Sequence, residues 1–140
     1  MKSCCSQMDY GHEPYVANVD QMAERNGNFR KAIWTGDNMQ MTLMSIPSGG
    51  EIGLEMHADT EQLLRVEAGY GVVKMGECKC RQNFCRHLQK GDVVFVPAGT
   101  WHNVINTGGC MLKVSSIYAP PNHPRGTLQR TKEEAEREEY

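Results

Sequence analysis

Two side chains that commonly bind metal ions stand two residues apart, Glu55 and His57 in the segment EIGLEMH. In an extended strand, residues i and i+2 project from the same face, so the carboxylate and the imidazole would point in one direction. A third candidate, His102, follows a strand-like run and a sharp Pro97-x-Gly99 corner. A carboxylate and two neutral imidazoles form a mixed nitrogen and oxygen set, which suits one divalent transition metal: Mn, Fe, Ni, Co or Zn.

The corner before His102 sets the depth at which this histidine enters the protein. Proline fixes φ and glycine permits an unusual turn, so Pro97 and Gly99 make the next strand begin at a defined point. Period-two alternation then places His102, Val104 and Asn106 on one face of that strand. We assign this face to the interior of a barrel.

The run GDVVFVPAGTWHNVIN reads Gly-x5-Pro-x-Gly-x2-His-x3-Asn and matches the second sequence motif of the cupin family at every fixed position. Residues 39–119, approximately, resemble single-domain cupins of the conserved-barrel type, and particularly the small bacterial cupins labelled mannose-6-phosphate isomerase-like. This resemblance implies an all-β fold, the cupin double-stranded β-helix or jelly-roll barrel. It also implies one bound metal ion and commonly a homodimer.

The first cupin motif, Gly-x5-His-x-His-x3-4-Glu-x6-Gly, occurs in altered form between Gly50 and Gly69. Glu55 stands where the family has its first histidine, with a one-residue difference in the spacing from the glycine. His57 stands at the second histidine. The carboxylate of the usual ligand set has therefore moved to the first position of the motif.

The next ligand position is either Gln62 or Glu61. Counting back seven residues from Gly69 selects Gln62, whereas Glu61 needs the three-residue gap and one extra residue before the glycine. We favour Gln62 because this register points Leu64 and Val66 inward. The opposite register would drive the charged residues of this strand into the core, at a high cost in free energy.

The favoured register leaves Arg65 and Glu67 outside the barrel, and the predicted metal ligands are then Glu55, His57, Gln62 and His102. Because only one of these ligands is anionic, a divalent ion would keep a net charge of about +1. Four protein ligands leave one or two coordination positions for water or substrate. Glu55 is also the candidate catalytic residue, as a group that could transfer a proton.

The segments that would position these ligands are short, strand-like and separated by Gly, Pro, Asn or Asp, which is typical of an all-β sandwich or barrel. They span residues 29–34, 39–46, 51–57, 61–68, 70–76, 87–89, 93–97, 101–107 and 111–119. Helix-cap spacing at Asn18 and again at Thr131 predicts a short helix near each end. We expect an N-terminal extension (1–28), the barrel (29–120) and a C-terminal tail (121–140) whose helix is solvated.

The composition and net charge of the chain indicate which classes of binding partner to expect. The chain has 140 residues, the size of one domain, and its net charge of −2 gives no reason to expect nucleic acid or an anionic membrane surface as a partner. No apolar run approaches the length that spans a bilayer, and the first residues lack the apolar stretch of a secretory signal. We therefore expect a cytoplasmic protein without nucleic-acid or membrane partners, and the cupin resemblance implies a small-molecule ligand or substrate.

Cysteines in the cytoplasm are normally reduced. Cys78, Cys80 and Cys85 fall in one polar stretch, and we expect free thiols on a hairpin loop. Two alternatives are a soft-metal site completed by His87 and a redox sensor built on this loop.

Cupins include isomerases, decarboxylases, dioxygenases, lyases and non-enzymatic sugar-binding modules, so the resemblance alone does not settle function. The first hypothesis is a metal-dependent isomerase or dioxygenase that acts on an anionic or polyhydroxylated small molecule. The alternative is a non-catalytic module that binds or senses a small molecule, such as a sugar, around a structural metal. An open coordination site would favour the enzyme, and a site closed by protein groups would favour the module.

Overall fold

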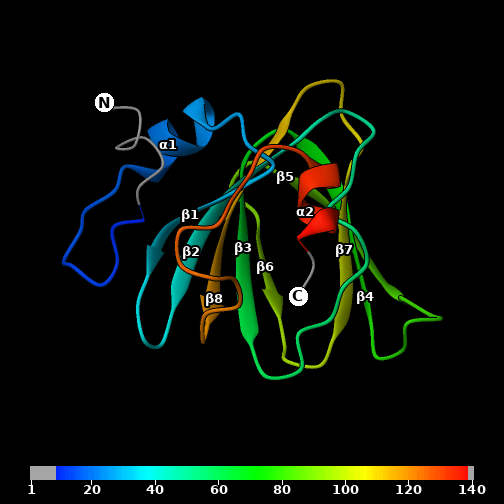
Figure 1. Cartoon of the computed structure of the whole chain (residues 1–140). Coiled ribbons are helices and arrows are strands. Elements are labelled where there is room, and N and C mark those ends of the chain that lie inside the picture. The colour runs from blue at the N-terminus through cyan, green and yellow to red at the C-terminus, as the bar shows by residue number, and fades with distance from the viewer. Residues whose placement is uncertain (1–8, 139–140) are drawn as a thin grey trace.

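The structure, a computed structural model, describes residues 9–138 (Figure 1). Its strands are β1 (Arg30–Thr35), β2 (Gln40–Ile46), β3 (Glu61–Ala68), β4 (Tyr70–Gly76), β5 (Phe84–Gln89), β6 (Val93–Val96), β7 (Trp101–Asn106), β8 (Leu112–Ala119) and β9 (Leu128–Gln129). Its helices are α1 (Val19–Arg25) and α2 (Lys132–Arg137).

The strands form two sheets, and the named pairs within them are antiparallel. One sheet has the order β6-β3-β8-β2-β1-β9, and the other has the order β5-β4-β7. Buried apolar residues of both sheets make one continuous core cluster. This arrangement confirms the expected all-β jelly-roll barrel with a short helix near each end.

The interior of the barrel is apolar at one end and polar at the other. Along β8, the inward residues Leu112 and Val114 are followed two and four residues later by Ser116 and Tyr118, which are also buried. The pairing of β2 and β3 with β8 brings further polar side chains to the same end, namely Gln40, Thr42 and Gln62. Period-two alternation therefore places a cluster of buried polar groups at one end of the core.

The connection between β2 and β3 departs from the regular strand expected at residues 51–57. It runs beside β7 and touches it through two isolated bridges, Glu51 with Ile105 and Glu55 with His102. Glycines interrupt it, since Gly53 adopts a φ of 109°, a conformation that side chains disfavour. The bridge at Glu55 nevertheless has both hydrogen bonds of an antiparallel pair, with N–O distances of 3.0 and 2.9 Å.

Both helices begin at the predicted caps. The side chain of Asn18 accepts a hydrogen bond from the Gln21 backbone N–H at 3.0 Å, and Thr131 Oγ1 accepts one from Glu134 N–H at 3.1 Å. Helix α1 packs through Ala23 on apolar residues of β1 and β2, outside the barrel. Neither described helix is long and apolar enough to cross a bilayer.

The prediction of free thiols is wrong for Cys78 and Cys80, which are joined by a disulfide. The turn after β4 brings their Cα atoms to 5.2 Å, a separation that a disulfide can bridge. Cys85 is an exposed free thiol. Among the described residues, the Cys78, Cys80, Cys85 and His87 side chains form no cluster of metal-binding atoms, so the soft-metal alternative has no support.

Candidate metal centre

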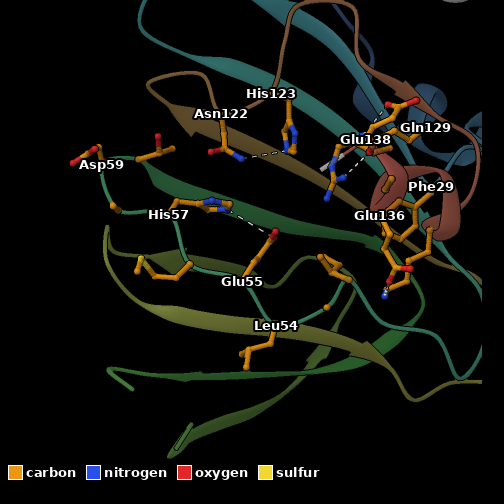
Figure 2. A pocket seen from close by; sticks show the side chains of 18 residues that line it. Phe29, Leu54, Glu55, His57, Asp59, Asn122, His123, Gln129, Glu136 and Glu138 are labelled. Carbon is orange, nitrogen blue, oxygen red and sulfur yellow. Dashed lines mark hydrogen bonds and ion pairs between the residues drawn. The ribbon is translucent and has the colours of Figure 1, made fainter. Parts of the chain in front are cut away.

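Three predicted ligands meet at the polar end of the barrel. Glu55 Oε2 lies 3.7 Å from His57 Nε2 and 3.6 Å from His102 Nε2, and the three ligand atoms all lie within 4.8 Å of one another. Figure 2 shows the Glu55 and His57 side chains directed toward each other inside a pocket. The β2–β3 connection supplies two of the residues, and β7 supplies the third.

His102 is held in a tautomer that suits metal binding. Its Nδ1 lies 2.9 Å from the carbonyl oxygen of Thr100, so this nitrogen carries the proton and donates it to the backbone. The other nitrogen, Nε2, then presents its lone pair to the pocket. The side chain is buried, and Nε2 has no hydrogen-bond partner in the part of the chain that the structure describes.

His57 is fixed through its backbone to the corner that precedes His102. Its carbonyl oxygen accepts a hydrogen bond from Gly99 N–H at 2.8 Å. Burial lowers the pKa of the His57 imidazole, although the Glu55 carboxylate opposes this shift. The ring is therefore neutral near pH 7, which is the form that binds a metal ion.

Glu55 is ionised at the centre of this cluster. Burial by itself would raise its pKa, but the adjacent His102 and His57 rings and the charge of Arg30 outweigh burial and lower the pKa below its ordinary value. The side chain keeps 29% of its surface exposed, and this part faces the pocket. The carboxylate is thus both charged and accessible to a small molecule.

The three side chains fit a metal ion. Buried polar atoms in proteins normally have hydrogen-bond partners, yet the Nε2 atoms of His57 and His102 have none among residues 9–138. Two atoms that each bind an ion at about 2.1 Å can lie at most about 4.2 Å apart. Both distances from Glu55 to the histidines, 3.7 and 3.6 Å, satisfy this limit, and the separation of the two histidine nitrogens is at most 4.8 Å.

Gln62 lies on the inward face of β3, as the favoured register requires. It is 4% exposed, and its Nε2 donates a hydrogen bond to Ser116 Oγ at 3.2 Å. Its Oε1 is buried and has no hydrogen-bond partner among the described residues, as expected of an atom that binds an ion or a water molecule. Glu61 is exposed. The place of Gln62 as a fourth ligand stays a prediction.

The two charged residues that follow Gln62 on β3 differ in exposure. Arg65 is partly exposed as expected, but Glu67 is buried on the outer face of the sheet. Its carboxylate accepts hydrogen bonds from Arg65 Nη1 at 2.6 Å and from Ser115 Oγ at 2.7 Å. These partners, which alternation along a single strand does not reveal, compensate the buried charge.

The candidate centre opens onto a cavity of about 560 Å³. Besides Glu55 and His57, its wall includes residues of β1, β9 and α2 (Figure 2). The C-terminal helix therefore lines the pocket, whereas the sequence favoured a helix surrounded by solvent. His123 also faces this pocket, with its ring edge-on to Tyr118 at 5.2 Å. Burial, together with the charge of Arg30, lowers the pKa of His123 to about 3.

Known proteins share both the fold and much of the sequence. An uncharacterized protein of Bacillus subtilis, YrkC, is 53% identical over 127 residues, which are 91% of this chain and 68% of that protein. The crystal structure of BH2720 from Bacillus halodurans has a TM-score of 0.92 and 48% identity, and the match covers 93% of this chain and 98% of that one.

A conserved Klebsiella pneumoniae protein with a double-stranded β-helix domain has a TM-score of 0.65 at 21% identity, with 85% of this chain and 100% of that chain covered. That level of identity shows the fold alone. The model of the cupin domain matches residues 42–118, more than half of the chain, and includes the metal-ligand candidates. The chain therefore belongs to the cupin family.

Proposed function

We propose that this cupin is a metal-dependent enzyme that acts on an anionic or polyhydroxylated small molecule. One divalent transition metal would be held by Glu55, His57, Gln62 and His102. The observation that carries the proposal is the position of the candidate ligand atoms. The partnerless imidazole nitrogens and the ionised carboxylate converge beside an open cavity of about 560 Å³.

When bound, the ion would supply a Lewis acid that polarises oxygen atoms of the substrate. The protein residues have separate roles. His57 and His102 would bind the ion through their imidazole nitrogens, and the hydrogen bond from His102 to Thr100 keeps its Nε2 available. Gln62 is neutral where cupins usually carry a carboxylate, so the centre stays more positive. A more positive centre polarises a carbonyl more strongly, and an isomerase needs this polarisation. The charge therefore favours isomerisation over the other candidate reaction, oxygen-dependent oxidation.

Glu55 is the residue that we propose for proton transfer. It is ionised because its pKa lies below the ordinary value, and its carboxylate is exposed to the cavity. A substrate in the cavity would lie within reach of this carboxylate, which could accept a proton from a carbon or hydroxyl next to a polarised carbonyl.

The second candidate is a non-catalytic module that binds or senses a small molecule around a structural metal. Structural metal sites are closed by protein ligands, whereas catalytic sites keep a position open. The cavity beside Glu55 and His57 favours the open arrangement and hence the enzyme.

Cobalt substitution tests the open site. We expect the Co²⁺-loaded protein to show d–d absorption bands that shift when azide is added, because a small anion would take the open position. The His102→Ala variant should lack these bands. Bands that do not respond to azide would favour the structural-metal module. With an open site shown, small acids and sugar phosphates can be screened for turnover that His102→Ala abolishes.

A further inference from the structure

The same cavity contains a buried cation whose role the metal centre does not explain. Arg30 is on β1 and points into the barrel, opposite Met44 on β2 and Gln129 on β9. It is 6% exposed, and it lines the cavity together with Glu55 and His57. A guanidinium is always charged, so this position places a permanent positive charge beside the candidate metal ligands.

The partners of Arg30 are neutral. Its Nη1 donates a hydrogen bond to Gln129 Oε1 at 2.7 Å, and its guanidinium carbon lies 5.3 Å from the centre of the Phe29 ring. Its Nε is buried and has no hydrogen-bond partner within the described range. Among residues 9–138, no carboxylate forms an ion pair with it, although three other arginines have such pairs. Buried charges in proteins are normally paired, so a counter-ion is missing here.

Glu55 is near enough for the charge of Arg30 to lower its pKa, but the two side chains are not in direct contact as an ion pair. Its carboxylate oxygen lies nearest to the two histidines, at 3.6 and 3.7 Å, and it forms no ion pair with Arg30. If Glu55 binds a divalent ion, its single negative charge offsets only part of the charge of that ion. The ion, Glu55 and Arg30 together then carry about +2 within the same cavity.

The other charged side chains of the cavity lie toward solvent. Lys132, the second non-histidine cation of the lining, is paired with Glu136, with Nζ 2.6 Å from the carboxylate. Asp59, Glu136 and Glu138 are exposed, and Glu138 Oε1 accepts a hydrogen bond from Gln129 Nε2 at 3.4 Å without contacting Arg30 in an ion pair. With a divalent ion bound, the interior therefore has a net positive charge, and a small anion is the species that complements it.

We propose that Arg30 binds the oxyanion group, a carboxylate or a phosphate, of the small molecule whose other oxygen atoms would bind the metal. The planar guanidinium matches both of these groups. This inference rests on the proposed function for the metal-bound part of the substrate. It narrows the substrate class to small anions and makes Arg30 the specificity-determining residue of the pocket.

Calorimetric titration of the metal-loaded full chain tests the proposal, with malonate as the carboxylate probe and inorganic phosphate as the phosphate probe. We expect at least one of them to bind, and the one that binds identifies the oxyanion. Arg30→Gln should weaken that binding at least about tenfold, because it removes one partner of a buried ion pair. Arg30→Lys keeps the positive charge but lacks the planar guanidinium, so its affinity for the probe should lie between those of wild type and Arg30→Gln. Arg86→Gln on the exposed strand β5 is the matched control and should bind like wild type.

Thermal unfolding separates a binding role from a structural role. Without added anion, the metal-loaded Arg30→Gln variant should melt no lower than wild type, because it loses a buried charge that has no counter-ion. The bound probe should raise the melting temperature of wild type but not of Arg30→Gln. If the variant melts clearly lower or fails to fold, Arg30 is structural and the proposal is wrong.

Metal analysis of the same samples separates this proposal from the metal centre. Arg30→Gln should retain as much metal as wild type, and loss of metal would contradict a role in anion binding. Equal binding by wild type and Arg30→Gln, or no binding of either probe to wild type, also overturns the proposal. If wild type itself holds no metal, the metal centre fails, and Arg30-dependent binding of a probe to the metal-free chain would still support Arg30.

Discussion

The negative charge of the candidate centre lies at Glu55, on the irregular β2–β3 connection, and the neutral Gln62 lies on the regular strand β3. The usual cupin motif has these charges reversed. A carboxylate at Glu55 faces the cavity, so the same residue can bind an ion and meet a substrate. For this reason the mechanism of another cupin cannot be transferred to this chain residue by residue.

Gln62 is tested by comparison with its neighbour Glu61. We expect Gln62→Leu to lower metal affinity about tenfold, because it removes a donor of the centre, and Gln62→Glu to raise it through an added negative charge. Glu61→Gln is the matched control and should leave affinity unchanged, since Glu61 is exposed. Competition with a chelator measures all three. If Glu61→Gln weakened metal binding and Gln62→Leu did not, the ligand position on β3 would belong to Glu61.

The lowered pKa of His123 predicts that the folded protein becomes less stable in acid. Burial, with the charge of Arg30, lowers the pKa of His123 to about 3 in the folded protein, whereas an unfolded chain binds the proton near pH 6.5. The unfolded state therefore binds more protons, and stability falls as the pH decreases from about 6.5 toward 3.

We expect wild type to lose about 1–2 kcal/mol more than His123→Gln between about pH 7 and about pH 5. Urea unfolding of both proteins at the two pH values measures this difference. Equal losses would mean that His123 takes up its proton in the folded state as readily as in the unfolded chain.

At the scale of the elements, alternation and capping predicted most of the fold. The runs at 61–68 and 111–119 alternate clearly between the two faces and correspond to β3 and β8, and Asn18 and Thr131 cap the two helices. These signals are local, so a single sequence contains them. Residues 51–57 also alternate, but Gly53 interrupts the pairing, and only isolated bridges form.

Long-range features could not be predicted in this way. Arg30 and Gln129 are separated by 99 positions, and only the β1–β9 pairing brings them together. The position of α2 against the cavity depends on the same pairing. Three of the four predicted metal ligands lie close together in the structure. Their prediction depended on a specific sequence motif and not on alternation alone.

Asn106 illustrates a motif residue with a structural role. It is 2% exposed, and its Nδ2 donates to the carbonyl oxygens of Ile46 and Cys110, both at 2.8 Å. Asn106→Ala leaves these acceptors unpaired and should lower the free energy of unfolding by about 2–4 kcal/mol. Metal stoichiometry should stay unchanged below the melting temperature. Asn38→Ala, at an exposed position, should change stability by less than about 0.5 kcal/mol.

If stoichiometric metal were lost from folded Asn106→Ala, Asn106 would be part of the metal site. Denaturant unfolding and metal analysis of the same preparation therefore separate the two roles. An unchanged free energy of unfolding would show that neither carbonyl oxygen depends on the Asn106 amide.

At the scale of the whole molecule, the candidate centre joins two parts of the barrel. His102 belongs to the three-stranded sheet, Gln62 to the six-stranded sheet, and Glu55 to the connection that runs beside β7. An ion bound by all of them would cross-link the polar end of the barrel. The expected homodimer stays a prediction.

This cross-link predicts that metal stabilises the fold. At a free metal concentration of 100 times the dissociation constant, the gain is about 2.7 kcal/mol if the unfolded chain does not bind the ion. We expect a higher melting temperature for the metal-loaded than for the chelated protein, and no such difference for His102→Ala. A wild-type melting temperature that is the same with and without metal would contradict the cross-link.

The most direct test of the metal centre is elemental analysis of the purified protein and of three histidine variants. We predict one divalent transition metal per chain in wild type and in His87→Ala, whose histidine is exposed on β5. His57→Ala and His102→Ala should lose the metal while they remain folded. Stoichiometric metal in both of these variants, or none in wild type after loading, would contradict the assignment.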